Sequence, residues 1–371
     1  MVFYTVLACT PLLVGLAVKL YYQCPINESK RAKRAFLFFS GLILFLVIAL
    51  RDKEVGSTDS QNYFANWERH GFLNFEGLKD SLSRTRQEFG YICTIWVLAH
   101  AFPEGQWLFV FTGLLYSISV CLFIYRNSDN VVVSFVMFLT WGLYSFMVQG
   151  LRQAVAMSIC LFAIESAKKR KLFRFIIQVF LAFCFHRSSV LFGMIYFIPW
   201  KKMCLVNKLQ MLVCAVLLFF CSNILLEIGI EMTKSTYNVV AEEGGFIALS
   251  LYAIVIFMGF FFIQHSKPAE DGQPYKVVLL STEEDRRKET LFIAMTLIGA
   301  TFYVMRYSSA VILERVSFFF MFGQMIVLPM AVKRFKPLSQ TLIYSIAIIL
   351  SVVLFMYRIS TSDLLPYNLF F

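Results

Sequence analysis

Long apolar runs, divided by short polar segments, fill most of the chain. A run of about 20 apolar residues can cross a bilayer as an α-helix, whereas an open sheet would leave unpaired backbone groups facing lipid. We therefore expect an all-α polytopic membrane protein. The pattern predicts about 12 transmembrane helices, at residues 3–22, 35–50, 104–125, 131–148, 151–167, 172–185, 188–200, 204–222, 248–264, 289–308, 316–332 and 339–357.

Some apolar runs are too short to cross a bilayer upright. Residues 172–185 and 188–200 fall below the ~20 residues that a span needs, which predicts a broken or re-entrant pair around His186. The segment 89–102 is also short and is closed by Phe102-Pro103-Glu104, so we expect a half-inserted, re-entrant helix there. The polar segment 265–288 carries mixed charges and is interpreted as a flexible cytoplasmic connector. All of 1–371 is expected to form one integral membrane domain.

The loop 51–88 is the longest polar segment on the face opposite that connector. Its aromatic and apolar residues recur at roughly helical spacing between Tyr63 and Leu78. Such spacing in a half-polar loop is typical of amphipathic helices that lie on a membrane surface. We predict one or two of these helices, at 63–71 and 75–82.

Composition and charge sharpen this topology. Of the 371 residues 59% are hydrophobic, above the roughly 45–50% of soluble domains. If 89–102 does not cross, most Lys and Arg residues share one face, which the positive-inside rule makes cytoplasmic, leaving the loop 51–88 and both termini outside. The net charge of +11 is thus a topology signal, and no nucleic-acid partner is expected. Most of the nine Cys lie in apolar runs, and no disulfide framework is implied.

A cluster of ionisable residues follows the apolar run that ends at Leu50. A charge at the membrane edge costs roughly 2–3 kcal/mol or more unless it is paired or hydrated, so Arg51 and Asp59 are candidate functional residues. The Gly-Ser-Thr-Asp turn fits a carboxylate of Asp59 that points back at the membrane surface. Lys53 and Glu54 are interpreted as a solvated loop.

Arg152 lies at the predicted start of a span, between Gly150 and Gln153. A guanidinium beside the free N–H groups of a helix N-terminus forms a suitable cradle for phosphate. The alternative is an arginine that only extends to the membrane surface.

Three further residues have two open interpretations. His186 interrupts an apolar run and is either a core histidine or a catalytic one. Arg306 and Arg315 flank a short outer turn, where each either contributes to a site or pairs with Glu314.

Several guanidiniums facing one outward cavity indicate a polyanionic lipid headgroup, because arginine binds phosphate oxygens bidentately. A carboxylate and an imidazole in the same cavity could accept a proton from a nucleophilic hydroxyl. The sequence contains no Gly-rich phosphate loop, no DxD-type carboxylate pair and no HExxH motif, so we expect neither a metal ion nor a cofactor.

The motifs, taken together, resemble those of a known family. Arg51, Val55 to Ser60 and Tyr63 resemble the "R…GTD…Y" signature of the EpsG-like, Wzy-type polysaccharide polymerases, although Ser57 stands between Gly56 and Thr58 here. Further matches follow in the expected order along the whole chain: Arg152-Gln153, Phe185-His186-Arg187-Ser188-Ser189, Glu314-Arg315-Val316 and Leu365-Pro366-Tyr367.

The resemblance implies a GT-C-like helical bundle in the bacterial inner membrane. Such a protein joins undecaprenyl-diphosphate-linked repeat units into O-antigen, capsule or exopolysaccharide on the periplasmic side, with a flippase and a chain-length regulator as partners. By the same resemblance, Arg152 and Arg315, supported by Arg51 or Arg306, would hold the donor diphosphate. Asp59 or His186 would be the base, and the expected substrate contacts would be Tyr63, Trp67, Gln153 and Tyr367.

Other membrane functions fit less well. An O-antigen ligase uses the same donor, but typically has a very long outer loop late in the chain. A membrane O-acyltransferase needs a histidine deep in the bundle with a cytosolic entrance. A transporter or flippase would place charges along a transmembrane path, whereas here they gather at one rim and no internal repeat is found.

Overall fold

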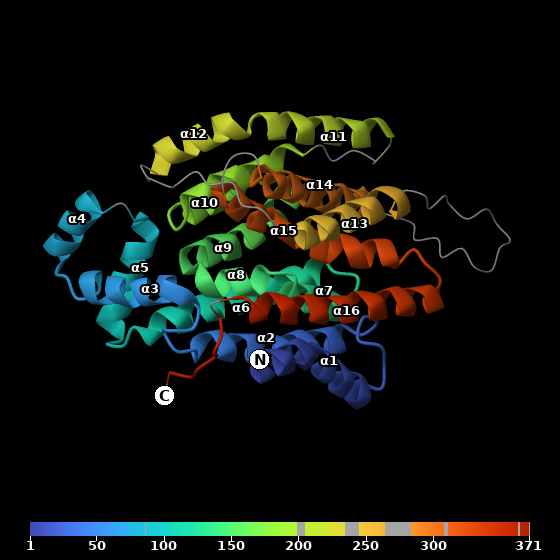
Figure 1. Cartoon of the computed structure of the whole chain (residues 1–371), viewed down its shortest axis with the longest axis horizontal. Helices are drawn as coiled ribbons and strands as arrows, with labels where there is room; N and C mark the ends of the chain where they lie inside the picture. The colour runs from blue at the N-terminus through green and yellow to red at the C-terminus, as the bar shows by residue number, and fades with distance from the viewer. Residues whose placement is uncertain are drawn as a thin grey trace.

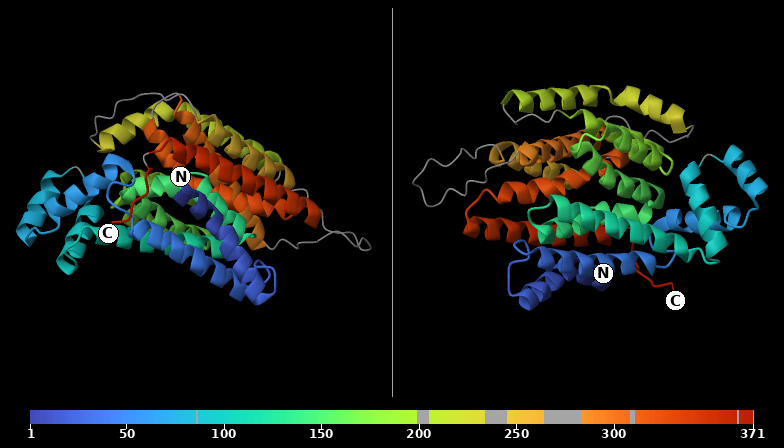
Figure 2. Two further views of the ribbon diagram at one scale, coloured as in Figure 1. Left: turned by 60° about the horizontal axis from the view of Figure 1, so that its bottom comes forward. Right: turned by 180° about the vertical axis from the view of Figure 1, so that it is seen from behind.

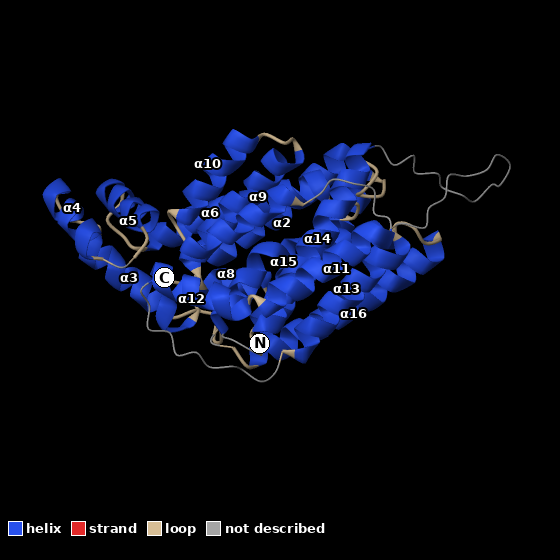
Figure 3. Cartoon of the chain, turned by 90° about the horizontal axis from the view of Figure 1, so that it is seen from above, coloured by secondary structure: helices blue, strands red, loops and turns tan. Residues whose placement is uncertain are grey.

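The computed structural model describes residues 1–85, 87–198, 205–233, 245–263, 283–307, 311–362 and 364–370. Within these ranges the chain is helical apart from its connections and one isolated β-bridge (Figures 1 and 3). The helices are α1 (Val2–Tyr22), α2 (Lys30–Ala49), α3 (Ser57–His70), α4 (Phe75–Arg84), α5 (Phe89–Ala101), α6 (Gln106–Asn127), α7 (Val131–Thr140), α8 (Leu143–Gln149) and α9 (Leu151–Lys168). They continue with α10 (Leu172–Phe183), the 3₁₀ helix η1 (Arg187–Phe197), α11 (Leu205–Phe220), α12 (Ser222–Thr233), α13 (Phe246–Phe262), α14 (Glu283–Met305), α15 (Val311–Val332) and α16 (Pro337–Ser360).

The helices confirm a polytopic membrane protein but not a count of about 12 spans. Among the described residues, six helices are long and apolar enough to cross: α1, α2, α6, α16, and the stretches Arg287–Met305 and Leu313–Val332 of α14 and α15. The pair α7 and α8, bent by 50°, makes a seventh if it is one broken span. The expected runs at 172–185 and 188–200 form a 12-residue α-helix and an 11-residue 3₁₀ helix, which are too short to cross upright.

The long helices lie roughly side by side, from α1 and α2 at one edge of the bundle to α11 and α12 at the other (Figure 1). Helix α14 packs along α15, α2 along α6, and α9 along α10. The centre is most enclosed at α7, α9 and α15, where Phe135, Met157 and Ile326 are fully buried. A bundle of this kind satisfies its backbone groups within each helix, which leaves the apolar outer faces free to meet lipid.

Helices α3, α4 and α5 project from one end of the bundle as a separate lobe (Figures 1 and 2). The lobe has its own apolar core, to which Tyr63, Trp67, Tyr91 and Ile95 belong. The two predicted helices of the loop 51–88 are therefore present. The first begins at Ser57 rather than at residue 63, directly after Gly56 in a left-handed conformation (φ +101°). The predicted position of these helices on the membrane surface, and of α5 within it, stays a prediction.

The C-terminal tail is fastened to the outer end of α2. Leu369 forms the isolated β-bridge with Arg51, and the Asp52 N–H donates to the Asn368 carbonyl at 2.9 Å. The Tyr367 hydroxyl donates to the Val47 carbonyl at 2.8 Å, and the Tyr367 ring stacks on Phe3. The tail thus ties together the first two helices at the point where the loop 51–88 begins.

Candidate functional site

A polar cavity of about 440 Å³ opens between the α3–α5 lobe and the bundle. Its walls come from α3, the segment before α5, the junction of α8 and α9, the turn before η1, and α15. It brings together most of the residues predicted from the sequence, namely Asp59, Tyr63, Arg152, Gln153, His186 and Arg315. The remaining lining residues are Asn62, Ala65, Asn66, Arg69, Gln87, Phe146, Gln149 and Gly150.

The junction of α8 and α9 forms one wall of the cavity. Helix α8 ends at Gln149, Gly150 separates the two helices, and α9 starts at Leu151. Since the first N–H groups of a helix have no partner within it, the start of α9 presents backbone donors beside Arg152 and Gln153. The sequence prediction that a helix begins here, next to an arginine, is confirmed.

Arg152 takes part in an ion pair at the cavity wall. Its Nη1 lies 2.5 Å from Glu88 Oε2, and its guanidinium lies 5.6 Å from the centre of the Tyr91 ring. These contacts hold the side chain toward the lobe, so Arg152 is not an arginine that merely extends to the membrane surface. The geometry also leaves part of the guanidinium open to the cavity, because about one third of the side chain is exposed.

Glu88 was not predicted from the sequence. It lies just before α5, its side chain is almost buried, and its second oxygen is 3.6 Å from His186 Nδ1. One carboxylate thus stands between Arg152 and His186. A signal was present: Glu88 directly precedes an apolar helix, the same kind of position that made Arg51 and Asp59 candidates.

His186 lies in the turn between α10 and η1, with its ring roughly parallel to that of Phe319. Burial lowers the pKa of His186 to about 4; the Glu88 carboxylate opposes this, while Arg152 and Arg315 add to it. The imidazole is therefore neutral at physiological pH. A neutral imidazole has one nitrogen that donates and one that accepts a proton.

Asp59 and Tyr63 are four residues apart on α3 and therefore share a face of that helix. Asp59 lies in the first turn, where the helix dipole favours a carboxylate. Tyr63 is almost buried against Tyr91, with ring centres 5.9 Å apart. Burial raises the pKa of the Tyr63 phenol, against an opposing influence of Arg152, so the hydroxyl remains a hydrogen-bond donor at neutral pH.

Gln153 and Arg315 link α9 to α15. The buried Gln153 side chain donates to the Arg315 carbonyl at 2.6 Å. Gln153 therefore fixes the backbone from which Arg315 extends. The Arg315 side chain is exposed, and among the described residues no carboxylate lies within ion-pair distance of it. Arg315 thus presents to the cavity a charge that no acid in the described part of the chain pairs with.

Two predicted residues of the loop 51–88 lie outside the cavity in the structure. Arg51 is fully buried: its Nη1 donates to the Val55 carbonyl at 2.6 Å, and its guanidinium lies 4.0 Å from the Phe109 ring centre. Trp67 is 2% exposed, with Nε1 donating to the Pro103 carbonyl at 3.4 Å. Neither lines the cavity, because one holds the 51–60 turn and the other fills the core of the lobe.

Two more predicted residues lie away from the cavity. Arg306 is paired with Glu314 at 2.8 Å and donates to the Tyr303 hydroxyl, which is the alternative that the sequence left open for it. Tyr367 anchors the C-terminal tail to α2. Both side chains use their polar groups in contacts that hold the fold together.

A row of amides on the lobe was also missed. The amides of Asn62 and Asn66, together with the guanidinium of Arg69, follow Asp59 along one face of α3. The Gln87 side-chain amide donates to Asn66 Oδ1 at 2.9 Å. The signal was their spacing of three and four residues, which becomes visible once α3 is known to start at Ser57. Amides offer both donors and acceptors, as sugar hydroxyls do. In the described parts of the chain, no three His, Cys, Asp or Glu side chains are grouped to hold a metal ion.

Comparison with known proteins gives one match. Residues 34–369 match the family model of the EpsG family, which covers nearly the whole chain and all the cavity residues. No curated protein and no solved structure matches the chain.

Proposed function

The chain belongs to the EpsG family of polysaccharide-polymerase-like proteins, and on this basis we propose that it joins lipid-diphosphate-linked oligosaccharide repeat units into a polysaccharide. The observation that carries the proposal is the convergence of Arg152 and Arg315, from α9 and α15, on one polar cavity beside a neutral His186. In this proposal the donor and acceptor are undecaprenyl-diphosphate-linked sugars, and the protein is a glycosyltransferase.

The charge of the cavity favours an anionic ligand. Three guanidiniums, from Arg69, Arg152 and Arg315, line it together with a single carboxylate, that of Asp59. Arginine holds phosphate oxygens in a bidentate geometry and keeps its charge in a low dielectric. Because Glu88 already compensates Arg152, Arg69 and Arg315 are the groups whose charges a diphosphate would neutralise first.

The reaction assigns a task to each wall of the cavity. A hydroxyl of the acceptor sugar attacks the anomeric carbon of the donor, and the bond from that carbon to the diphosphate oxygen breaks. The diphosphate leaves with the bonding electrons, and Arg152 and Arg315 stabilise the charge that builds on it. The proton of the attacking hydroxyl passes to a base, either Asp59 or His186.

Glu88 would support His186 in that role. A carboxylate beside the second nitrogen of an imidazole orients the ring and stabilises the imidazolium that forms, as in hydrolase triads. The 3.6 Å separation of Glu88 Oε1 from His186 Nδ1 places the carboxylate on the appropriate side of the ring. Glu88 is thus a positioning residue, and not a cavity-lining one.

The acceptor and donor sugars would lie against the amide row of α3. Asn62, Asn66 and Gln87 match sugar hydroxyls, and Phe146, which stacks on Phe318 at 3.9 Å, supplies an aromatic surface at the cavity in place of Trp67. The lobe and cavity are proposed to face the periplasm of a bacterial inner membrane, from the distribution of basic residues. A flippase would supply the repeat units and a chain-length regulator would limit the product.

The test is a surface-polysaccharide gel on the host strain with this gene deleted and then restored. Wild type should produce a ladder, whereas Arg315→Ala should leave only the single-repeat band. Arg84→Ala is the matched control, because Arg84 is a largely exposed arginine of the lobe outside the cavity. A normal ladder from Arg315→Ala would refute the proposed role of the cavity. Loss of even the single repeat in the deletion strain would indicate a ligase or flippase instead.

A further inference from the structure

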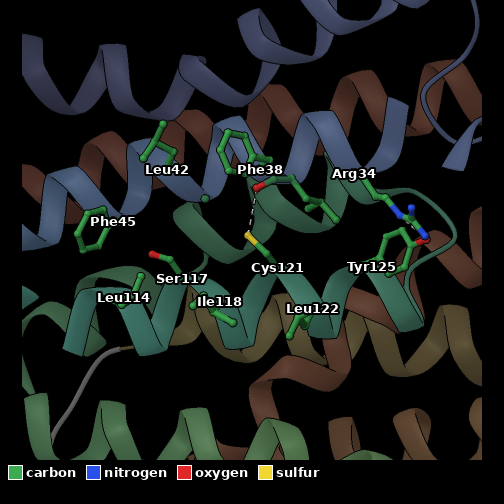
Figure 4. Close-up of a pocket in the computed structure, with 12 residues that line it drawn as sticks. Arg34, Phe38, Leu42, Phe45, Leu114, Ser117, Ile118, Cys121, Leu122 and Tyr125 are labelled. Carbon is green, nitrogen blue, oxygen red and sulfur yellow. Dashed lines mark hydrogen bonds between the residues drawn. The ribbon is translucent and has the colours of Figure 1, made fainter. Parts of the chain in front are cut away.

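A second, apolar groove runs along the outer surface of the bundle between α2 and α6. It has a volume of about 560 Å³ (Figure 4). Its lining residues are Arg34, Leu37, Phe38, Gly41, Leu42, Phe45, Leu114, Ser117, Ile118, Cys121, Leu122 and Tyr125. Since both helices are long and apolar enough to cross the membrane, the groove lies on a face that meets lipid hydrocarbon.

Small residues create the floor of the groove. A Cβ on Gly41 would come within 2.7 Å of Cys121 Sγ, and a Cβ on Gly113 within 3.0 Å of Ile48. The two helices therefore approach closely at these glycines, as membrane helices do where small residues meet. Large side chains such as Phe38 and Leu114, both exposed, rise on either side and form the walls (Figure 4).

The length of the groove corresponds to one leaflet of a bilayer. From Arg34 to Phe45 it follows twelve residues of α2, a rise of roughly 16 Å at 1.5 Å for each step along the helix. Half of a hydrocarbon core of about 30 Å is about 15 Å. The groove starts near the first residue of α2 and the last turn of α6 and ends near Phe45 of α2. With its start at the lipid headgroups, it would end near the middle of the membrane.

The open end of the groove is positively charged. Arg34 donates from Nε to the Tyr125 hydroxyl at 3.3 Å, and its two terminal nitrogens have no protein partner in the described residues. Figure 4 shows this pair side by side at one end of the groove. Lys30, Arg31 and Lys33 share the first turns of α2, and no acid lies in its first turn. An anionic group is thus favoured where the groove meets the headgroup region.

We propose that this groove binds one acyl chain of an anionic phospholipid, with the lipid phosphate on Arg34. A second copy of this chain is a poorer occupant, because a two-fold dimer across the groove would bring two sets of these cations together at the same membrane boundary. The groove is also distinct from the proposed reaction site. Its charged end is at the start of α2, whereas the loop that leads to the cavity begins at the other end of that helix.

The experiment measures the lipid that the full-length protein retains. Protein purified from bilayers of equal phosphatidylglycerol and phosphatidylcholine is examined by native mass spectrometry. Wild type should retain one phosphatidylglycerol in preference to phosphatidylcholine. Arg34→Gln should reduce this preference about five-fold, the effect expected for one basic residue at the headgroups. Leu42→Trp, which fills the groove, should reduce retention of both lipids.

Two control variants separate the groove from general effects. Arg126→Gln removes an exposed cation at the same end of α6 that does not line the groove, and Ile346→Trp adds a tryptophan to the exposed face of α16. Both should retain lipid as wild type does. The proposal is overturned if Arg34→Gln keeps the wild-type preference for phosphatidylglycerol, or if the control variants lose as much lipid as the groove variants. It is also overturned if the protein retains a prenyl lipid instead, or is isolated as a lipid-free dimer. None of these readouts depends on polymer synthesis.

Discussion

Arg51 and Arg315 both lie near the junction of α8 and α9, yet their surroundings are opposite. Arg51 is fully buried and donates to Val55 and Ser60, with Phe109 over its guanidinium. Arg315 is exposed to the cavity, and in the described structure no acid compensates it. Only Nη1 of Arg51 donates within the described structure, and its Nε and Nη2 are buried without a hydrogen-bond partner. A guanidinium enclosed in this way supports the fold, whereas one that stands open in a cavity is available to a ligand. This difference in burial and partners distinguishes an arginine that supports the fold from one that can bind a ligand, whereas the sequence motifs did not distinguish them.

The strongest test of this comparison is the pair Arg315→Ala and Arg51→Ala. Loss of Arg315 should lower polymer formation by about 100-fold or more, the usual effect of removing one group that stabilises developing charge. Its melting temperature should stay close to that of wild type, because Arg315 is exposed. Polymer formation in proteoliposomes and thermal unfolding of the same preparations measure the two effects.

Arg51→Ala should show the reverse pattern. Its removal takes away the charged hydrogen bond to the Val55 carbonyl, which then keeps only the Ser60 hydroxyl as a donor, and this loss should cost about 1.5–3 kcal/mol of stability. Polymer formation per folded molecule should change little. A large loss of activity in a fully stable Arg51 variant would place this arginine in the site and erase the distinction.

The Arg152–Glu88 pair is intermediate between these two extremes, because it is both structural and part of the cavity wall. Arg152→Ala leaves a nearly buried carboxylate without its partner and should cost both stability and activity. Adding Glu88→Gln to Arg152→Ala should recover the stability but not the activity. Unfolding and polymer assays on Arg152→Ala, Glu88→Gln and the double variant form a double-mutant cycle. Recovery of activity in the double variant would mean that Arg152 acts only as a partner for Glu88.

The pH dependence tests the role of His186. With a folded pKa of about 4 and an unfolded value of about 6.5, the unfolded chain binds more protons between these values. Stability should therefore be complete above pH 6.5 and decrease as the pH falls toward 4. His186→Gln should flatten this slope in thermal melts, whereas replacement of the exposed His100 by glutamine should not.

The same titration distinguishes the two candidate bases. If His186 accepts the proton, activity declines on the acid side with an apparent pKa near 4. Glu88→Gln should move that decline to lower pH, because the carboxylate raises the pKa of His186. A polymer assay across pH should show this shift. An acid limb that is unchanged in both Glu88→Gln and His186→Gln would assign the base role to Asp59.

Particular residues show what the sequence could and could not reveal. The apolar runs predicted the long helices, and the charges at their ends predicted Asp59, Arg152, His186 and Arg315 at one cavity. The order of the motifs also indicated the EpsG family, which the family match confirms. The count of about 12 spans is not confirmed, because apolarity alone does not distinguish a helix that crosses from short elements such as the 3₁₀ helix η1 and α10.

The predicted site residues that lie away from the cavity have a different explanation. Arg51, Trp67 and Tyr367 carry the same side-chain chemistry as site residues, and only their burial and hydrogen-bond partners show that they support the fold. Glu88 was not predicted as a site residue because its partners, Arg152 and His186, are far from it in the sequence. Contacts between distant segments decide both cases, and a single sequence does not contain them.

The smallest effect is expected where a predicted site residue turned out to be an anchor. Tyr367→Phe keeps the ring that stacks on Phe3 but removes the hydroxyl that donates to Val47. The loss of one such hydrogen bond should cost about 0.5–1.5 kcal/mol of stability and leave the polymer ladder unchanged. Tyr63→Phe is the matched change in the cavity, and it should weaken polymer formation, because Tyr63 lines the cavity and its hydroxyl contacts Arg152. If the two variants exchanged these phenotypes, the tail rather than the lobe would contact the sugar, and the division between scaffold and site would have to be redrawn at the C-terminus.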